Sequence, residues 1–260
     1  MKKFNLKTDA GNLIPCEAII PEEPRAIVII THGFGSCKES PTAQMMLKAL
    51  PETGFGAIAY DLPAHGTSGA ENEELSLALC VKYMKTVEEY LISEYLFPRI
   101  YYFSSSFGAY TNLTYLSQES HTGDKSFLRS AAVNMPELFD RTANPAAAEL
   151  LEEQGYLTIE EGGPAPVKVP VKFFEELEQN NLFEVIPEPF SSAPQLDGME
   201  LMMVHGEKDM VIDPAKARLF AEKKSIPLEM LENEDHTLST NPDSPGRVAE
   251  MAVDFFSCRL

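Results

Sequence analysis

Apolar runs and helical patterns alternate along most of the chain. The apolar runs are short and rich in Val, Ile and aromatic residues, as buried strands are. The predicted central strands are Ala26–Thr31, Gly56–Asp61, Arg99–Phe103, Ala131–Met135 and Leu201–Val204, and the short run Leu228–Leu231 follows them as a last strand. Strands that alternate with helices indicate a mostly parallel sheet with helices on both faces.

Helical spacing of apolar residues predicts the elements between these strands. Ser40 and Pro41 are a typical helix start, because the serine can cap the first turn and proline suits the first helical position. Residues 73–93 and the end of the chain around Val248–Phe255 repeat apolar residues every three or four positions. We interpret these stripes as core-facing helix surfaces and not as cofactor sites.

One stretch, from about Leu138 to Pro194, breaks the alternation. It predicts helices at Ala146–Gln154 and Phe173–Gln179, strands at Tyr156–Ile159 and Val167–Val169, and a turn at Gly162–Pro164. We therefore expect a small cap, residues 138–194, inserted over one end of the sheet. No repeat or composition break divides the chain, so we expect one α/β domain over residues 1–260.

Composition narrows the class of protein. The formal net charge of −19 argues against nucleic-acid binding, which needs a cationic surface. No apolar run approaches the roughly 18–20 residues of a membrane span, and the N-terminal lysines precede no apolar segment of a secretory signal. Four separated cysteines without a CxxC pair suggest neither a zinc site nor a disulfide framework. We expect a cytoplasmic protein without a metal or cofactor.

The segment around Ser106 has the pattern of a nucleophile elbow. The apolar strand ending at Phe103 leads into three serines, and a helical pattern of Tyr110, Leu113 and Leu116 follows at once. Such a strand–turn–helix holds a serine hydroxyl out at the carboxyl end of a parallel sheet, and it needs small residues on both sides. Ser106 has them, with Ser104 two positions before and Gly108 two positions after.

A serine nucleophile needs a base within hydrogen-bond reach. His236 lies in an acidic loop just past Leu228–Leu231, where this type of sheet presents its base. Loop packing or surface exposure explains the remaining histidines: His32, His65, His121 and His205.

The base in turn needs a carboxylate that orients its ring. Asp209 follows the strand Leu201–Val204 and is our candidate, with Glu207 and Asp213 as neighbours that could be mistaken for it. The chain order is then serine, aspartate, histidine, as in α/β-hydrolases.

Two backbone N–H groups are needed to stabilise the oxyanion of an acyl-transfer reaction. The glycine-rich segment His32–Ser36 follows the strand Ala26–Thr31, so the amides of Phe34 and Phe107 are the candidates. A dinucleotide-binding loop is the alternative reading of these glycines, but the third glycine and the ribose-binding acid are missing.

These motifs together resemble the α/β-hydrolase superfamily over nearly the whole chain. The matching segments are Thr31–Ser36, Tyr60–Gly69, the Ser106 elbow, Val204–Asp209 and Asp235–His236. The short cap and the His-Gly-Phe loop resemble the cinnamoyl or feruloyl esterase-like carboxylesterases, while monoacylglycerol lipases and serine aminopeptidases share most of the motifs. Ser104 and Ala64 stand where the superfamily commonly has glycine.

The resemblance and the motifs imply a serine carboxylic-ester hydrolase (EC 3.1.1.-) acting on a small-molecule ester through an acyl-enzyme. A serine aminopeptidase or an acyl thioesterase would use the same triad, and an aminopeptidase should carry an acidic anchor for the substrate amine near the cap. A non-catalytic binding protein with this fold is a third possibility. The aromatic residues of the cap suggest an apolar or aromatic acyl group, or form the cap's own core: Phe139, Tyr156, Phe173, Phe174 and Phe183. The sequence leaves the substrate-binding residues and the oligomeric state open.

Overall fold

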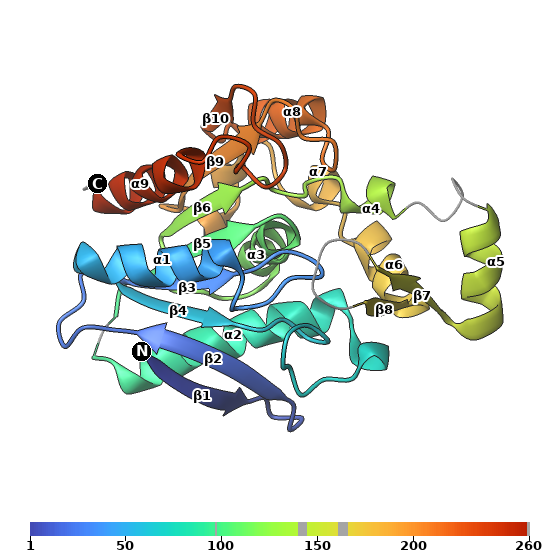
Figure 1. The fold of residues 1–260 in the computed structure, drawn as a ribbon, viewed down its shortest axis with the longest axis horizontal. Helices are drawn as coiled ribbons and strands as arrows, with labels where there is room; N and C mark the ends of the chain where they lie inside the picture. The colour runs from blue at the N-terminus through green and yellow to red at the C-terminus, as the bar shows by residue number, and fades with distance from the viewer. Residues whose placement is uncertain (97, 140–144, 161–165, 259–260) are drawn as a thin grey trace.

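The computed structural model describes residues 1–96, 98–139, 145–160 and 166–258. In this part of the chain the main element is an eight-stranded sheet (Figure 1). Its strands, in order across the sheet, are β1 (Lys2–Lys7), β2 (Leu13–Ile19), β4 (Gly56–Tyr60), β3 (Ile27–Thr31), β5 (Ile100–Ser105), β6 (Lys125–Arg129), β9 (Glu200–Gly206) and β10 (Leu228–Leu231). β1 and β2 are antiparallel to their neighbours, and the other neighbouring strands are parallel to each other.

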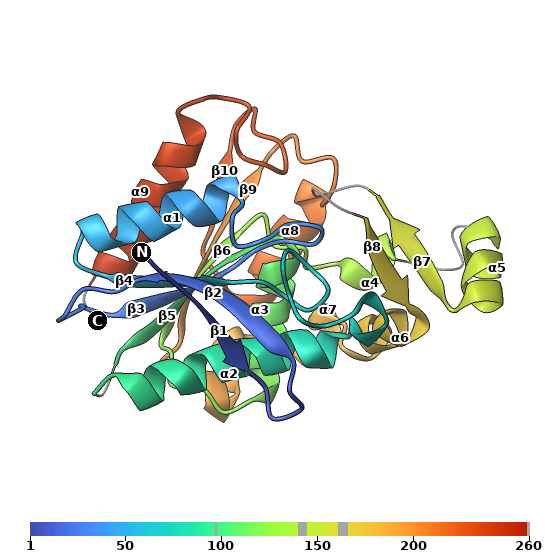
Figure 2. The same cartoon turned by 60° about the horizontal axis from the view of Figure 1, so that its bottom comes forward.

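Helices cover both faces of the sheet, as Figure 2 shows from a second direction. The helices α1 (Pro41–Glu52) and α9 (Ser244–Ser257) lie side by side on one face. The opposite face packs against α2 (Leu77–Glu94), α3 (Phe107–Gln118) and α8 (Pro214–Lys224). Because both faces are covered, β3, β4 and β5 are buried along their whole length, which explains why they read as continuous apolar runs.

The structure confirms the mostly parallel α/β fold and most of the predicted strands, but the strand predicted at Ala131–Met135 is wrong. The strand at this place is β6, six residues earlier, and residues 131–134 form a loop that leads into the short helix α4 (Met135–Leu138). The buried ends of β6 are charged, Lys125 and Arg129, so the segment lacks the apolar pattern of a central strand. The antiparallel strands β1 and β2 were not predicted.

Within the segment 138–194, predicted to form a cap, the described residues 145–160 and 166–179 lie at one end of the molecule (Figure 1). After α4 its described elements are α5 (Pro145–Gln154), β7 (Tyr156–Ile159), β8 (Val167–Pro170), α6 (Val171–Gln179), α7 (Leu182–Val185) and the 3₁₀ turns η3 (Phe190–Ser192) and η4 (Pro194–Leu196). β7 and β8 pair as an antiparallel hairpin, close to the predicted ranges. The predicted turn at Gly162–Pro164 lies outside the described residues. The division into one domain with an inserted cap stays a prediction.

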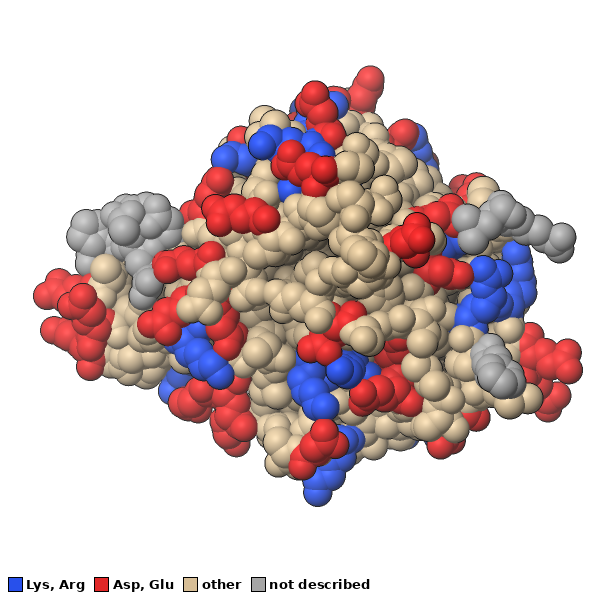
Figure 3. Space-filling view, turned by 180° about the vertical axis from the view of Figure 1, so that it is seen from behind, with Lys and Arg blue, Asp and Glu red and all other residues tan. Residues whose placement is uncertain are grey.

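The surface carries the charge that the composition predicts. Figure 3 shows one face, over which acidic side chains are widely spread while basic ones gather in a few small groups. Among the described residues there is no helix with the length and apolar character that crossing a membrane requires.

Candidate active site

Ser106 lies at the sharp turn between β5 and α3. Its backbone dihedrals, φ 52° and ψ −118°, are unusual for a residue with a side chain, and such strain is found where surrounding structure enforces it. The helix α3 starts close to the sheet, because a Cβ at Gly108 would lie 2.4 Å from the carbonyl oxygen of His32. The turn therefore requires glycine at 108 and accepts a fully buried serine at 104.

The structure brings three of the predicted side chains into one hydrogen-bonded chain. The Nε2 atom of His236 lies 2.9 Å from the Oγ atom of Ser106, and its Nδ1 atom lies 2.7 Å from the Oδ2 atom of Asp209. The carboxylate is fully buried, whereas 19% of the His236 side chain is exposed. A hydroxyl, an imidazole and a carboxylate are thus arranged so that the ring can accept the serine proton while the carboxylate orients it.

The Asp209 carboxylate is held ionised by its surroundings. Burial alone would raise the pKa of Asp209, but hydrogen bonds from His205 and His236 outweigh it and hold the pKa well below its usual range. The Nε2 atom of His205 lies 3.1 Å from Oδ2, and the backbone N–H groups of Val211 and Ile212 donate to Oδ1 at 2.8 Å each.

The two other acids near β9 do not contact His236 in the described structure. Glu207 is exposed and pairs with Arg218 at 2.9 Å. Asp213 accepts a hydrogen bond from the backbone N–H of Ala215 and caps α8. The geometry therefore favours Asp209 over Glu207 and Asp213 as the partner of His236.

The loop that carries His236 is fixed by the end of β6 and by its own turn. The Ser130 hydroxyl donates to the carbonyl oxygen of His236 at 2.9 Å, and the Arg129 guanidinium donates to the carbonyl oxygen of Thr237. The buried Glu234 carboxylate accepts hydrogen bonds from the backbone of Thr240 and from the Ser244 hydroxyl at the start of α9. The imidazole is therefore presented from a well-anchored loop.

The loop after β3 brings a second element against the nucleophile. A Cβ at Gly33 would lie 3.1 Å from the Cβ of Ser106, so the loop touches the serine directly. Among the described residues, the backbone N–H groups of Phe34 and Phe107 have no hydrogen-bond acceptor. These are the two predicted oxyanion donors, and their role stays a prediction.

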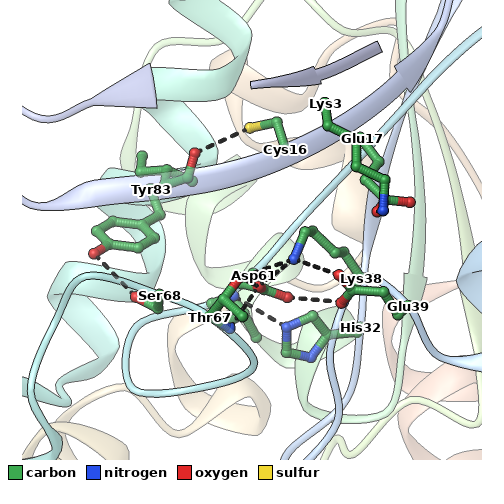
Figure 4. Close-up of polar contacts among 12 residues, drawn as sticks. Lys3, Cys16, Glu17, His32, Lys38, Glu39, Asp61, Thr67, Ser68 and Tyr83 are labelled. Carbon is green, nitrogen blue, oxygen red and sulfur yellow. Dashed lines mark hydrogen bonds and ion pairs between the residues drawn. The ribbon is translucent and has the colours of Figure 1, made fainter. Parts of the chain in front are cut away.

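A buried polar cluster supports this loop from behind (Figure 4). The Asp61 carboxylate accepts hydrogen bonds from the Lys38 backbone and ammonium, at 2.8 and 2.7 Å, and from the Thr67 backbone at 2.9 Å. Burial would raise the pKa of Asp61, but the hydrogen bonds from Lys38 hold it below its usual range. His32 accepts the backbone N–H of Leu62 at 3.0 Å. The cluster ties the loop after β3 to the loop after β4.

A cavity of about 820 Å³ opens beside Ser106. On the cap side its walls include Phe34, Phe107 and Phe139. The ring centroid of Phe34 lies 5.7 Å from that of Phe107, edge-on, and 5.7 Å from that of Phe139, tilted. The cap aromatics thus divide: Phe139 lines the cavity, while Phe173 and Phe174 are buried behind it. Among the described residues, no group of three or more His, Cys, Asp or Glu side chains is arranged to hold a metal ion.

Sequence reasoning missed several residues that shape the site. His205 was assigned to loop packing, but it contacts the Asp209 carboxylate. The sequence pattern does not indicate Arg129 and Ser130, because it predicts the strand later in the chain, at Ala131–Met135, whereas β6 ends at Arg129. A charged residue directly after the apolar pair Phe127 and Leu128 is the signal that could have identified Arg129.

Comparison with known families assigns the chain to one of them. The sequence profile of the Hydrolase_4 family, described as serine aminopeptidase, S33, matches residues 22–158. This chain belongs to the Hydrolase_4 family. The matched segment includes the loop after β3, the Asp61 segment and the Ser106 elbow. The Hydrolase_4 protein is therefore a hydrolase with the α/β-hydrolase fold.

Solved structures show the same fold at low sequence identity. A protein from Agrobacterium vitis S4 has a TM-score of 0.83 and 17% identity, with 98% of each chain covered. Est1E from Butyrivibrio proteoclasticus, solved with bound ferulic acid, has a TM-score of 0.79 and 17% identity over 98% of this chain and all of that chain. Mouse α/β hydrolase domain-containing protein 10 has a TM-score of 0.75 and 14% identity over 99% of this chain and all of that chain. No curated protein sequence matches this Hydrolase_4 protein.

Proposed function

We propose that this hydrolase is a serine carboxylic-ester hydrolase. The observation that carries the proposal is the continuous hydrogen-bonded relay from Ser106 through His236 to Asp209, at 2.9 and 2.7 Å. The likeness in fold to Est1E, which was solved with ferulic acid bound, supports an ester substrate.

In the proposed mechanism Ser106 Oγ attacks the ester carbonyl carbon while His236 Nε2 takes its proton. The carbonyl oxygen becomes an oxyanion that the Phe34 and Phe107 amides stabilise, each donor contributing about 2.7–4 kcal/mol in comparable enzymes. The C–O bond to the alcohol then breaks, and His236 returns the proton to the departing alkoxide. Water cleaves the acyl-enzyme by the same sequence, and a carboxylic acid and free serine result.

The lining of the cavity favours an ester over a peptide with a free amine. An aminopeptidase needs an anionic anchor for the substrate ammonium, and none of the described residues that line the cavity is Asp or Glu. The charged side chain among them is Arg129, which would repel an ammonium group. An ester without a positive charge meets neither obstacle.

The test is hydrolysis of 4-nitrophenyl butyrate against that of alanine 4-nitroanilide, with a fluorophosphonate probe for the nucleophile. We expect turnover of the ester, little turnover of the anilide, and labelling that Ser106→Ala abolishes. Ser106→Ala should lower kcat by about six orders of magnitude, as nucleophile removal does in related triads.

Ser117→Ala is the matched control. Its hydroxyl bonds a carbonyl within α3, far from the turn that holds Ser106, and it should keep wild-type turnover. Turnover of the anilide above that of the ester would replace the esterase assignment with a peptidase. If the wild-type protein showed no turnover of either substrate and no labelling by the probe, the result would indicate a binding protein.

A further inference from the structure

The cavity beside Ser106 continues across the edge of the sheet. Besides the residues of its cap side, its lining includes residues near the carboxyl ends of β3, β5 and β6 and residues of the helices α1 and α9. We call this part the inner lobe, and its walls are Ile30, Phe103, Ser105, Arg129, Leu238 and Val248. Ser106 and His236 line the same cavity as these residues, so a substrate bound at the serine can place one of its groups in the inner lobe.

Arg129 projects to the inner lobe because of its position on β6. Side chains alternate along a strand, so Lys125, Phe127 and Arg129 share one face. Phe127 packs against Phe255 of α9, with ring centroids 6.1 Å apart, which identifies that face as the one covered by α1 and α9. Arg129 occupies the last position of this row, at the edge where the cavity begins.

The guanidinium is buried without a carboxylate partner in the described structure. Only 8% of Arg129 is exposed, and its described hydrogen bond goes to a neutral acceptor, the carbonyl oxygen of Thr237. Burial lowers the pKa of Arg129 to about 10, although the charges of Asp235 and Asp209 raise it. The group therefore remains a cation at neutral pH, and a buried cation is favourable only when an anion compensates it.

The lining of the cavity differs in charge from the protein as a whole. The chain has 40 Asp and Glu residues, yet none of the described lining residues is acidic. The first turns of α1 and α9 also contribute to the wall, through Thr42 and Pro245. The first turns of two helices, which carry the positive ends of the helix dipoles, therefore border the same cavity as Arg129.

We propose that the inner lobe binds a carboxylate carried by the ester substrate, with the Arg129 guanidinium as its partner. The planar guanidinium can donate two parallel hydrogen bonds to a carboxylate, a geometry that an ammonium does not offer. This proposal rests on the proposed esterase function and names its substrate class. The carboxylate can belong to the acyl group or to the alcohol, and the experiment separates the two.

The experiment compares charged esters with neutral isosteres. Mono-4-nitrophenyl adipate and its monoamide differ by a carboxylate against a carboxamide at the end of the acyl group. 3-Butyryloxybenzoate and 3-butyryloxybenzamide place it in the leaving alcohol. For the wild-type protein we expect kcat/KM of the charged member to exceed that of the neutral member by at least about tenfold in one of the pairs, mainly through KM. The pair that shows the preference identifies the side of the ester that enters the inner lobe.

Arg129→Gln should reduce this charged-to-neutral ratio to about one or below, and Arg129→Lys should retain part of it. Lys125→Gln is the matched control, because Lys125 is a buried cation on the same strand face that does not line the cavity and pairs with Glu200 at 3.2 Å. It should keep the wild-type ratio. Because Arg129 also bonds the His236 loop, the ratio and not the absolute rate is the readout.

A measurement on the unaltered protein covers the case in which Arg129→Gln does not fold. Benzoate should inhibit hydrolysis of 4-nitrophenyl butyrate competitively and more strongly than benzamide does. The inference is overturned if the wild-type protein turns over neutral esters without preference for a charged member of either pair, or if Arg129→Gln keeps the preference. Failure to hydrolyse any ester would instead refute the proposed function itself.

Discussion

Replacing Asp209 with Asn tests the relay at its buried end. The substitution keeps the size of the side chain and leaves one oxygen for the backbone N–H groups of Val211 and Ile212. It removes the negative oxygen that lies 2.7 Å from His236 Nδ1 and 3.1 Å from His205 Nε2. An amide in this place can donate to Nδ1 and stabilise the tautomer that cannot accept the Ser106 proton.

The expected loss is large in activity and moderate in stability. The equivalent change in a serine protease lowers kcat about 10⁴-fold, which corresponds to about 5.5 kcal/mol of transition-state stabilisation. Hydrogen bonds to a charged group contribute about 1.5–3 kcal/mol each. Since Asn keeps both backbone contacts, we expect Asp209→Asn to lower the free energy of unfolding by about 2 kcal/mol.

The pH dependence of stability gives a second readout of the same carboxylate. The pKa of Asp209 is lower in the folded protein than in the unfolded chain, so the unfolded chain binds the proton more readily. The ionised carboxylate therefore stabilises the fold above its ordinary pKa of about 3.9, and this stabilisation is lost as the pH falls below that value. The stability difference between wild type and Asp209→Asn should shrink in the same range.

Asp213→Asn is the matched control for these measurements. Asp213 lies four residues away and caps α8, so its replacement can reduce stability by up to about 1 kcal/mol and should leave esterase turnover unchanged. Steady-state kinetics with 4-nitrophenyl butyrate and urea unfolding provide both quantities. If Asp209→Asn retained more than about a tenth of wild-type kcat, Asp209 would not orient the base.

Two further predictions concern the loop after β4. Ala64 has φ 61°, a left-handed conformation that costs a residue with a Cβ about 1–2 kcal/mol. Ala64→Gly should therefore raise the melting temperature, measured by calorimetry, by about 1–2 °C. A lower melting temperature would contradict this. Burial lowers the pKa of His65 to about 4, so the unfolded chain binds this proton first and stability falls as the pH drops from about 6.5 towards 4. Between pH 7 and pH 5, the free energy of unfolding of His65→Asn, measured in urea, should therefore fall by about 2 kcal/mol less than that of the wild-type protein. Equal decreases in the two proteins would show that His65 does not titrate in this range.

The sequence predicted the parts of the structure that local chemistry determines. The buried strands β3, β4 and β5 are continuous apolar runs because helices cover both faces, so their pattern was readable. The elbow was readable because the close approach of α3 to the sheet excludes a side chain at Gly108. The nucleophile, base and acid each follow a strand, and the carboxyl ends of parallel strands meet at one edge of the sheet.

The parts that sequence reasoning missed depend on contacts between distant segments. β6 carries Lys125, whose ammonium is buried because it donates to the backbone carbonyls of Phe255 and Cys258, at 3.2 and 2.7 Å. These acceptors lie about 130 residues later in the chain, so no local pattern indicates that a lysine can begin a central strand. The contact of His205 with Asp209 could not be predicted for a similar reason. In the sequence His205 is an ordinary residue near the end of a strand, and only the fold of the following loop brings Asp209 back to it.

The end of β6 links the nucleophile to the base through different atoms of neighbouring residues. The carbonyl oxygen of Arg129 accepts the backbone N–H of Ser106 at 2.9 Å, its guanidinium holds the carbonyl of Thr237, and the Ser130 hydroxyl holds that of His236. A substitution at 129 keeps the first contact, removes the second and leaves the third. Because the positioning of the loop affects every ester alike, while the charge acts only on an anionic one, turnover of a neutral ester measures the positioning, and the charged-to-neutral ratio isolates the charge.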